Sequence, residues 1–391
     1  MRTHEYSTLA ASLRDLADPR GAQGQRYEWV YLLVVIAAAL LAGETSVRGM
    51  AQWAQQQRTE LLDCLQPKWR RIPSAATLSR VLQRVDVLLL ERRVAAFVQG
   101  LDADDGVPGS VVMRNGVRLR GQALDGKTVC GASRPGQTVH LVSVVRHESG
   151  AVLAQDKVAV KLDERSVAHT LLANLPLSQT VTTMDALHTH RKLAQQIIAG
   201  GGHYLMVVKA NQPTLAEEIA LAFQELPPQR QTIADWWGYQ VHQTSEKGHG
   251  RLERRTLESI TALNDYLIWP AVAQVLRRTC WTQHRTTGQI TQEIHYGLTS
   301  LPRALVSVAQ VEQFWRWHWT IENRLHYIRD VTLGEDASQL RTGNAPQALA
   351  ALRNALLSLL RYEGWSRIPD ALRFFAHNVQ HSLQLIGAFA S

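Results

Sequence analysis

The chain has 391 residues, 45% of them hydrophobic and 19% charged, which is the composition of an ordinary globular protein. This length predicts two or three domains, or one domain with a large insertion. The formal net charge of +8 predicts an acidic partner, with nucleic acid first and a membrane surface second. The three cysteines, Cys64, Cys130 and Cys280, lie far apart, which excludes a zinc ribbon or a disulfide framework and favours a reducing, cytoplasmic location.

The first hundred or so residues have a helical pattern. The longest apolar run, Trp29 to Ala42, is shorter than the ~20 residues that cross a membrane. It also lies too far from the N-terminus, behind charged residues, to be a secretory signal. It therefore predicts a buried core helix that ends at Gly43, and no membrane partner. A second helix is expected from Ser46 through Trp53.

A basic segment follows, "KWRRIPSAATLSRVLQRVD". Its proline predicts a turn, and Ser74 is a suitable N-cap for an amphipathic helix. Arg80 and Arg84 are four residues apart and therefore share one face of that helix. Two interpretations stay open, a small helix-turn-helix-like DNA-binding unit and a helix with a solvated basic face.

After an acidic linker, Asp102 to Ser110, the pattern changes to short strands. Asn115 and Gly116 predict a hairpin, and a second turn is expected at Glu148 to Gly150. Strands and helices then alternate, so that the predicted order is β-β-β-α-β-α-β. This order predicts an α/β sheet with mixed pairing and is that of an RNase-H-like fold.

The remaining chain predicts three further segments. Residues 229–301 contain hairpin patterns rich in His, Arg and Lys, which predict a β-rich insertion. A tryptophan-rich helix is expected from Val311 to about Ile328. Another helix, Pro346 to Tyr362, precedes a basic helical tail.

The stretch "GQALDGKT", Gly121 to Thr128, fits the phosphate-loop pattern letter for letter. Such a loop needs an apolar strand before it and a helix after it, because loop amides and the helix N-terminus hold the phosphates together. The preceding "RNGVRLR" is half charged, and the following "VCGASRPGQ" contains two glycines and a proline. The match is therefore attributed to coincidence, and the acid within it, Asp125, becomes the residue of interest.

Two aspartates are expected at strand ends on one edge of one sheet, where α/β folds place their sites. Asp125 follows "VRLRGQAL" and Asp185 follows "VTTM". Two such carboxylates suit a hard cation, because Mg²⁺ takes oxygen ligands from one or two carboxylates and leaves room for phosphate. The alternative for each aspartate is a simple turn former.

Glu322 is the best third acid, because it lies in an otherwise apolar helix and shares a face with His318 and His326. The alternatives are a buried ion pair and a zinc site, and the zinc site is disfavoured because ligands four residues apart along one helix spread too far. Three rival acids follow it and are ranked lower because a turn or strand is expected from Val331: Asp330, Glu335 and Asp336.

Five segments in this order resemble a DDE-type insertion-sequence transposase of the H-repeat-associated group: "LDGKT", "TTMDALHTH", "YLMVVKANQPTL", "EKGHGRLERR" and "HWTIENRLHYIRDVTLGEDASQLRTGNAP". The resemblance covers almost the whole chain. It implies an RNase-H-like fold that a β-rich insertion interrupts before the last acid. It also implies that Asp125, Asp185 and Glu322 are the metal-binding catalytic acids, with Mg²⁺, or alternatively Mn²⁺, as cofactor.

The resemblance and the patterns together define five expected segments. These are a helical, DNA-binding N-terminal region (1–100), the first part of the RNase-H-like catalytic domain (111–228), the β-rich insertion (229–304), a catalytic helix that completes the domain (305–345) and a C-terminal helical tail (346–391).

Around the last acid the chain departs from the pattern of many related transposases. Trp315, His318 and Arg329 replace a tyrosine, an arginine and a lysine. Trp and Arg are plausible substitutes, whereas the charge of a histidine depends on pH. The sequence therefore defines the residues that bind the DNA end less well than it defines the metal site.

We expect basic side chains to contact DNA phosphates, with the alternative that each is an ordinary surface charge. The expected DNA-binding residues are Lys209, Arg251, Arg254, Arg255, His318, Arg329, Arg80 and Arg84, and a turn at His249 is expected near DNA.

The expected function is that of a transposase that cuts the ends of an insertion sequence and joins them to target DNA by two-metal phosphoryl transfer. Its partners would be the transposon ends and the target DNA, and it would act as a homodimer in the DNA complex. Two alternatives remain, an inactive DNA-binding transposase relative and an RNase-H-like structure-specific nuclease that cuts without joining.

Overall fold

A computed structural model describes residues 8–103, 110–132, 139–158, 164–224, 237–248 and 250–388. Most of the expected linker and the whole of His249 lie outside these residues. The chain divides into two compact units. The helical unit comprises Met1–Pro108, Gly126–Val167 and Ile321–Ser391, and the sheet unit comprises Gly109–Asp125 and Ala168–Thr320.

The N-terminal part of the helical unit is built from short helices around one apolar helix, α2. Every residue of α2 except Val30 is buried, which confirms the expected core helix. No helix among the described residues is long and apolar enough to cross a membrane. The helices are α1 (Leu9–Arg14), α2 (Trp29–Leu41), α3 (Val47–Gln56), α4 (Arg58–Leu65), α5 (Ala75–Arg84) and α6 (Val87–Asp102).

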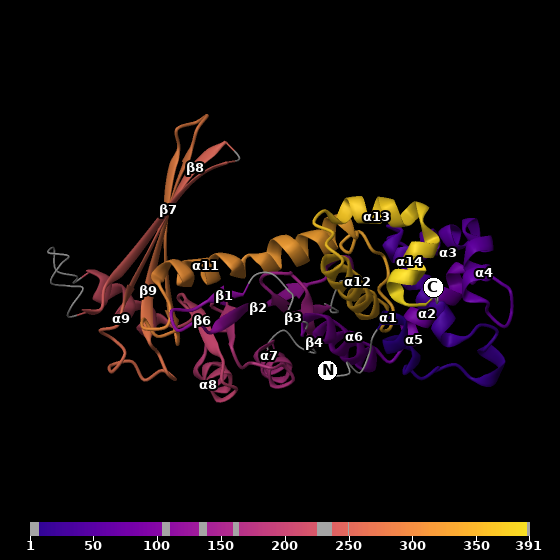
Figure 1. Cartoon of the computed structure of the whole chain (residues 1–391), viewed down its shortest axis with the longest axis horizontal. Coiled ribbons are helices and arrows are strands. Elements are labelled where there is room, and N and C mark those ends of the chain that lie inside the picture. The colour runs from indigo at the N-terminus through magenta and orange to yellow at the C-terminus, as the bar shows by residue number, and fades with distance from the viewer. Residues whose placement is uncertain are drawn as a thin grey trace. The chain divides into compact units, whose positions relative to one another are not determined.

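The C-terminal helices complete the same unit. They are α12 (Ala345–Tyr362), α13 (Ile368–His377) and α14 (Val379–Ile386). Helix α12 is buried along most of its length and packs against α5, α6 and strand β4, while α14 packs against α2 and α4 (Figure 1). The antiparallel strands β3 (His140–Arg146) and β4 (Val152–Val158) turn at Gly150, whose φ of +71° suits glycine. Segments far apart in sequence therefore share one core.

The sheet unit contains a mixed sheet. Its strands are β1 (Val111–Val112), β2 (Arg118–Thr128, whose last three residues belong to the helical unit), β5 (Thr180–Met184), β6 (His203–Val208), β7 (Gln240–Gly248), β8 (Arg251–Ile260), β9 (Gln274–His284) and β10 (Ile290–Thr299). Strands β2, β5 and β6 are parallel neighbours, and the order continues β6-β10-β9-β8-β7 with antiparallel pairs. The mixed α/β class expected from the sequence is confirmed.

Four helices accompany these strands along the chain. They are α7 (Glu164–Ala173), α8 (Arg191–Ala199), α9 (Pro213–Gln224) and α11 (Val308–His318). Helix α11 begins with a reciprocal cap in which Ser307 and Gln310 satisfy each other's backbone amides. Its apolar side packs on the sheet, where Phe314 and Trp315 join a core cluster with Val181 and Leu205.

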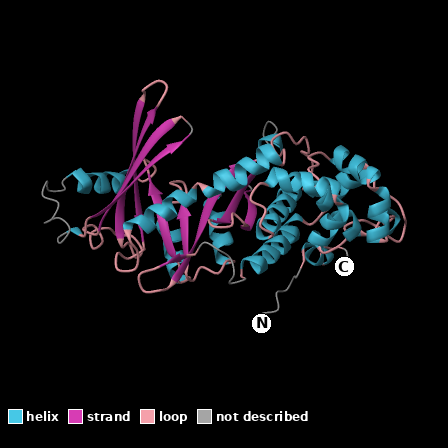
Figure 2. Ribbon diagram, turned by 45° about the horizontal axis from the view of Figure 1, so that its top comes forward, coloured by secondary structure: helices cyan, strands magenta, loops and turns pink. Residues whose placement is uncertain are grey.

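The predicted hairpins of residues 229–301 are present as β7–β8 and β9–β10, but they extend the central sheet. Strand β10 pairs with β6 over four residues, from Tyr296↔Val208 to Thr299↔Leu205. Gly297 lies at this junction, where a Cβ atom would stand 2.7 Å from the Trp315 ring. The outer parts of the four strands are the long arrows that project from the sheet in Figure 2. Helix α9, which the sequence analysis did not place, precedes them.

Candidate active site

The stretch that mimics a phosphate loop is an extended strand. All of Gly121 to Thr128 lies in β2, and no helix begins there. A strand cannot gather its backbone amides around a phosphate as a loop does. The structure thus agrees with the sequence argument against nucleotide binding at this position.

Asp125 and Asp185 lie at matching positions of two neighbouring parallel strands. The last paired residues of β2 and β5 are Leu124 and Met184, and each aspartate follows directly. Asp185 lies at the end of its strand as expected, whereas β2 continues to Thr128, so the expected strand end at Asp125 was wrong. Paired positions of parallel strands project their side chains to the same face, and the next position projects to the other face. The two half-buried carboxyl groups therefore share one face of the sheet unit.

The turn after Asp185 is fixed by its own hydrogen bonds. The backbone N–H of His188 donates to Asp185 Oδ1 at 3.2 Å, and the hydroxyl of Thr189 donates to the Asp185 carbonyl at 2.9 Å. The Thr189 hydroxyl also lies 2.6 Å from the carbonyl oxygen of Val207 in β6. The segment "DALHTH" is thus an ordered turn that holds the carboxylate at the strand end.

His318, at the end of α11, reaches the same face of the sheet. Its Nδ1 lies 3.1 Å from the Thr183 hydroxyl, and Thr183 is two residues before Asp185, hence on the same face. The C-terminal end of α11 therefore covers the face that carries both aspartates. This contact places His318 beside the acids but does not test a contact with DNA.

Glu322 lies in the helical unit, on a π-helical segment η4 (Ile321–His326) that is followed by a second, η5 (Ile328–Thr332). The sequence predicted an ordinary helix to about Ile328. π-helical turns are rare and are frequent at functional sites. The Glu322 side chain is 57% exposed, and its Oε2 lies 3.0 Å from His326 Nδ1.

The His326 contact sets the charge of Glu322. This hydrogen bond lowers the pKa of the Glu322 carboxyl, and the nearby Lys127 charge acts in the same direction. Burial lowers the pKa of His326, so that its ring is neutral near pH 7. A neutral His326 ring that donates its Nδ1–H to an ionised Glu322 carboxylate is consistent with the lowered pKa of both groups.

Two of the three rival acids are neutralised by cations. Asp330 forms an ion pair with Lys127. Glu335 is buried, and although burial opposes it, the charges of Arg329 and Arg353 lower its pKa. Residues 328–332 are π-helical, so the expected turn or strand at Val331 was wrong. Charge compensation therefore disfavours Asp330 and Glu335, whereas Asp336 is exposed.

Arg329 was expected to contact DNA, and the structure contradicts this. Its side chain is fully buried, with both nitrogens of its fork 2.9 Å from the Glu335 carboxylate. A third nitrogen donates to Gln155 at 2.9 Å. A guanidinium that is fully engaged inside a core has no donor left for a phosphate. No local pattern predicts the burial of Arg329, because Gln155 and Arg353 lie far from it along the chain.

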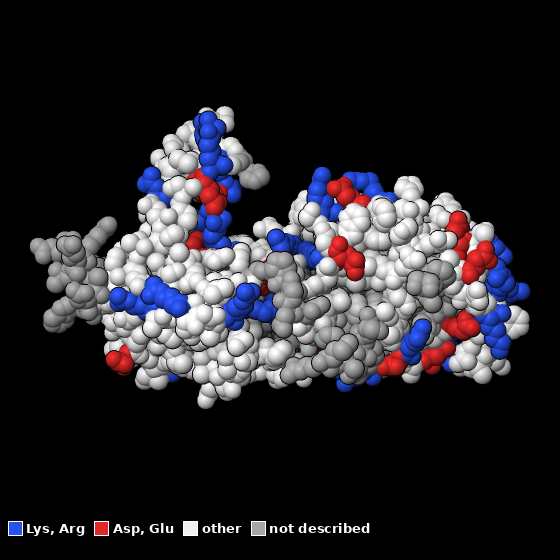
Figure 3. Space-filling view, viewed as in Figure 1, with Lys and Arg blue, Asp and Glu red and all other residues white. Residues whose placement is uncertain are grey.

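The other expected DNA-binding residues remain on the surface in differing states. Lys209 is exposed just after β6. Arg254 is exposed and lies over the Trp281 ring at 5.6 Å. Arg251 and Arg255 both pair with Glu253, which reduces the free charge expected there. Figure 3 shows Lys and Arg side chains along the projecting strands β7 and β8.

Comparison with known proteins identifies the family. Residues 117–360 match the family described as "Transposase DDE domain", and residues 10–98 match one described as "DDE_Tnp_1-associated". The first match covers more than half of the chain, and the chain therefore belongs to the DDE transposase family.

Individual relatives agree with this assignment and with the resemblance to H-repeat-associated proteins. "Putative transposase YncI" of Escherichia coli O157:H7 is 28% identical over 298 residues, which are 74% of this chain and 71% of that protein. "H repeat-associated putative transposase YhhI" of Escherichia coli strain K12 is 28% identical over 250 residues, 61% of this chain and 63% of that protein. A solved piggyBac transposase synaptic complex has a TM-score of 0.45 and 10% identity over 97% of this chain and 76% of that chain, a likeness from which nothing further follows.

Proposed function

We propose that this protein is an active DNA transposase with an RNase-H-like catalytic core. It would cut the ends of its insertion sequence and join them to target DNA, with Asp125, Asp185 and Glu322 as catalytic, metal-binding acids. The observation that carries the proposal is the matching position of Asp125 and Asp185 on adjacent parallel strands. Family membership supports the transposase function, and the resemblance of the sequence motifs implies the same three acids.

The third acid is supported by covalent continuity along β2. Asp125 lies two residues before Lys127 in this strand. Lys127 pairs with Asp330 and lies 3.5 Å from the carbonyl oxygen of His326, so it contacts the π-helical segments that carry Glu322. Within the helical unit, the last residues of β2 are therefore in contact with the segment that carries Glu322.

The donors fit a hard divalent cation. All three are carboxylates, and the hydrogen bond from His326 keeps Glu322 ionised, as a metal ligand must be. When bound, two Mg²⁺ ions would activate the attacking oxygen and stabilise the leaving oxygen. Mn²⁺, which shares the preference for oxygen ligands, would be an acceptable substitute.

The residues of the chain would contribute the remaining functions. Asp125, within β2, and Asp185, directly after β5, would present their carboxylate oxygens on the same face of the sheet. His318 would lie close to the scissile phosphodiester, where its imidazole can donate a hydrogen bond. The exposed cations Lys209 and Arg254 would hold the DNA backbone, and a homodimer would pair two DNA ends.

The test is cleavage of a labelled duplex that carries the DNA flanking this gene. With Mg²⁺, wild-type protein should nick at the element boundary, and an Asp125→Asn variant should bind the same DNA without nicking. Asp336→Asn is the control, because Asp336 is an exposed acid beyond the end of η5 and this variant should cut normally. Equal cleavage by wild type and Asp125→Asn would refute the proposal.

The two alternatives give different results in the same assay. A DNA-binding relative without activity would bind but not nick with any metal. A structure-specific nuclease would nick but would not join the released 3′ end to a second duplex, which a strand-transfer product on a gel reports.

A further inference from the structure

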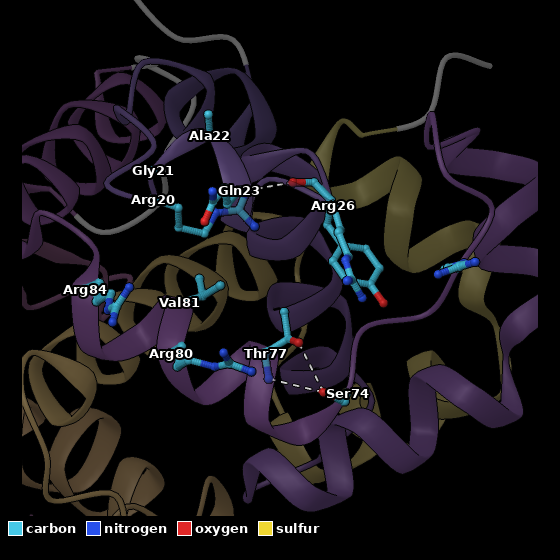
Figure 4. Close-up of a pocket in the computed structure, with 12 residues that line it drawn as sticks. Arg20, Gly21, Ala22, Gln23, Arg26, Ser74, Thr77, Arg80, Val81 and Arg84 are labelled. Atoms are coloured by element: carbon cyan, nitrogen blue, oxygen red, sulfur yellow. Dashed lines mark hydrogen bonds between the residues drawn. The ribbon is translucent and has the colours of Figure 1, made fainter.

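The N-terminal helices of the helical unit surround a pocket of about 880 Å³. Twelve residues line it, and they include five arginines and no carboxylate. We call it the arginine pocket, after Arg20, Arg26, Arg71, Arg80 and Arg84. Figure 4 shows Arg20 and Arg26, from the segment before α2, across the hollow from Arg80 and Arg84 of α5. Arg71 comes from the segment before α5. A concave surface of one sign of charge concentrates the field that an oppositely charged ligand meets.

The charge of one arginine of the pocket, Arg20, is compensated by a neighbouring carboxylate. Arg20 forms a two-pronged ion pair with Asp18, with both contacts at 2.8 Å, and donates to the Tyr27 carbonyl at 2.6 Å. Its guanidinium correspondingly lowers the pKa of Asp18. Among the described residues the other four arginines form no ion pair with a carboxylate. Four positive charges thus remain for a ligand.

Hydrogen bonds connect the segments that line the pocket. Two tyrosine hydroxyls, from just before α2 and from its first turn, hold the segment before α5: Tyr27 donates to the Ile72 carbonyl at 3.0 Å and Tyr31 to the Arg71 carbonyl at 3.1 Å. Ser74 caps α5 by accepting from the Thr77 amide, and both residues line the pocket. The N-terminus of this ten-residue helix therefore adds a favourable dipole for an anion.

The chemistry of the lining indicates phosphate groups. Guanidinium groups bind phosphate oxygens through paired, charge-assisted hydrogen bonds. Arg80 and Arg84 are exposed one turn apart on α5, about 6 Å along the helix axis, so the charge continues out of the pocket along the helix. A single small anion could not use this extended arrangement, whereas a chain of linked phosphates could.

We infer that the arginine pocket binds the sugar-phosphate backbone of duplex DNA, with Arg26 and Arg71 joining Arg80 and Arg84 in contacts to successive phosphates. This rests on the proposed function, because it takes DNA as the substrate. Contacts of this kind fix the position of the protein on the duplex without reading its sequence. Arg26 and Arg71 were not among the DNA-binding residues expected from the sequence.

The test measures how the full-length protein binds labelled duplex DNA as salt is raised, by fluorescence anisotropy without Mg²⁺. Each lost phosphate contact should reduce the slope of log K against log salt by about one. Arg26→Ala and Arg71→Ala should each do so, and the double variant should lose about two. Arg92→Ala is the matched control, because Arg92 is exposed and bonds the carbonyl four residues before it, as Arg80 does.

Two outcomes would overturn the inference. The first is an Arg26→Ala/Arg71→Ala protein with the wild-type slope. The second is displacement of DNA by inorganic phosphate well beyond that by chloride of equal ionic strength, which would indicate a free-anion site. A nicking assay distinguishes this inference from the proposed function. Reduced slopes in the arginine variants, together with no nicking by the wild-type protein, would support DNA binding by the arginine pocket and refute the proposed catalytic activity.

Discussion

His326 Nδ1 lies 3.0 Å from Glu322 Oε2, four residues away on the same π-helical segment. The hydrogen bond orients an otherwise exposed carboxylate and lowers its pKa. A group that orients a metal ligand is conventionally worth ~10- to 100-fold in metal affinity or activity. His326 is therefore a positioning residue for the proposed third acid.

Replacing His326 should weaken the response to metal rather than the binding of DNA. We expect His326→Ala to slow nicking about 10- to 100-fold at low Mg²⁺, with partial recovery as Mg²⁺ is raised. His326→Gln, which keeps a side-chain N–H donor, should retain more activity. The measurement is the nicking rate of each protein as a function of Mg²⁺ concentration. If His326→Ala gave the same curve as the wild-type protein, His326 would not position Glu322 for metal binding.

Arg329 should prove to be a structural residue. Removing it leaves Glu335 buried beside Arg353 alone, and breaking a buried ion pair of this type typically costs about 3–5 kcal/mol. We expect Arg329→Ala to lower the midpoint of thermal unfolding by several degrees or to prevent folding. Arg70→Ala is the comparison, because its ion pair with Asp63 is largely exposed and such pairs contribute about 0–1 kcal/mol.

A milder variant keeps this prediction testable if Arg329→Ala does not fold. Arg329→Lys keeps the charge but loses the fork that contacts Glu335 and Gln155. It should fold with reduced stability and bind DNA with an unchanged salt slope. A reduced salt slope together with normal stability would restore the DNA-binding interpretation of this residue.

The sequence predicts the two strands that carry the aspartates because their signals are local, although it places the end of only one of them correctly. The apolar run before Asp185 ends with β5, whereas β2 continues past Asp125 to Thr128. The cap at Ser74 and the end of α2 near Gly43 are similarly local and are confirmed. The matching position of the two aspartates then follows from parallel pairing.

Other features depend on information that no short window carries. Four-residue spacing does not separate a π-helix from an ordinary helix, so η4 could not be foreseen. The burial of Arg329 depends on Glu335 and on distant partners such as Gln155. The merging of the N- and C-terminal helices into one unit arises from packing between segments far apart in sequence. Helix α9, by contrast, carries a local signal, because Pro213 at its first position is a common helix start.

Glu91 should make stability depend on pH. It is buried between amide groups of Gln155 and Gln347, and burial raises its pKa to about 8. An unfolded glutamate titrates near 4.5, so between these values the folded state holds a proton that the unfolded state has released. Stability should therefore fall as pH rises from about 5 to 8, by at most about 5 kcal/mol.

Glu91→Gln should remove this dependence, because an amide of the same shape cannot ionise. Thermal unfolding midpoints measured from pH 5 to 9 should show wild type losing stability relative to the variant as pH rises. A difference between the two proteins that stays constant across this range would mean that Glu91 is already ionised at pH 5.

Gly297 should tolerate no side chain, because β10 passes directly under the Trp315 ring. A Cβ atom there would lie 2.7 Å from the ring and 2.9 Å from the Met206 carbonyl oxygen, closer than packed atoms can approach. Overpacking of a core typically costs about 1–3 kcal/mol. Gly297→Ala should therefore lower the thermal midpoint, whereas Gly248→Ala, where nothing lies within 4 Å of the added atom, should leave it nearly unchanged.

Because Trp315 belongs to α11, whose end carries His318, a shift of this helix should also slow nicking. Gly297→Ala with normal stability would mean that Trp315 moves aside freely and that α11 is not fixed by this contact.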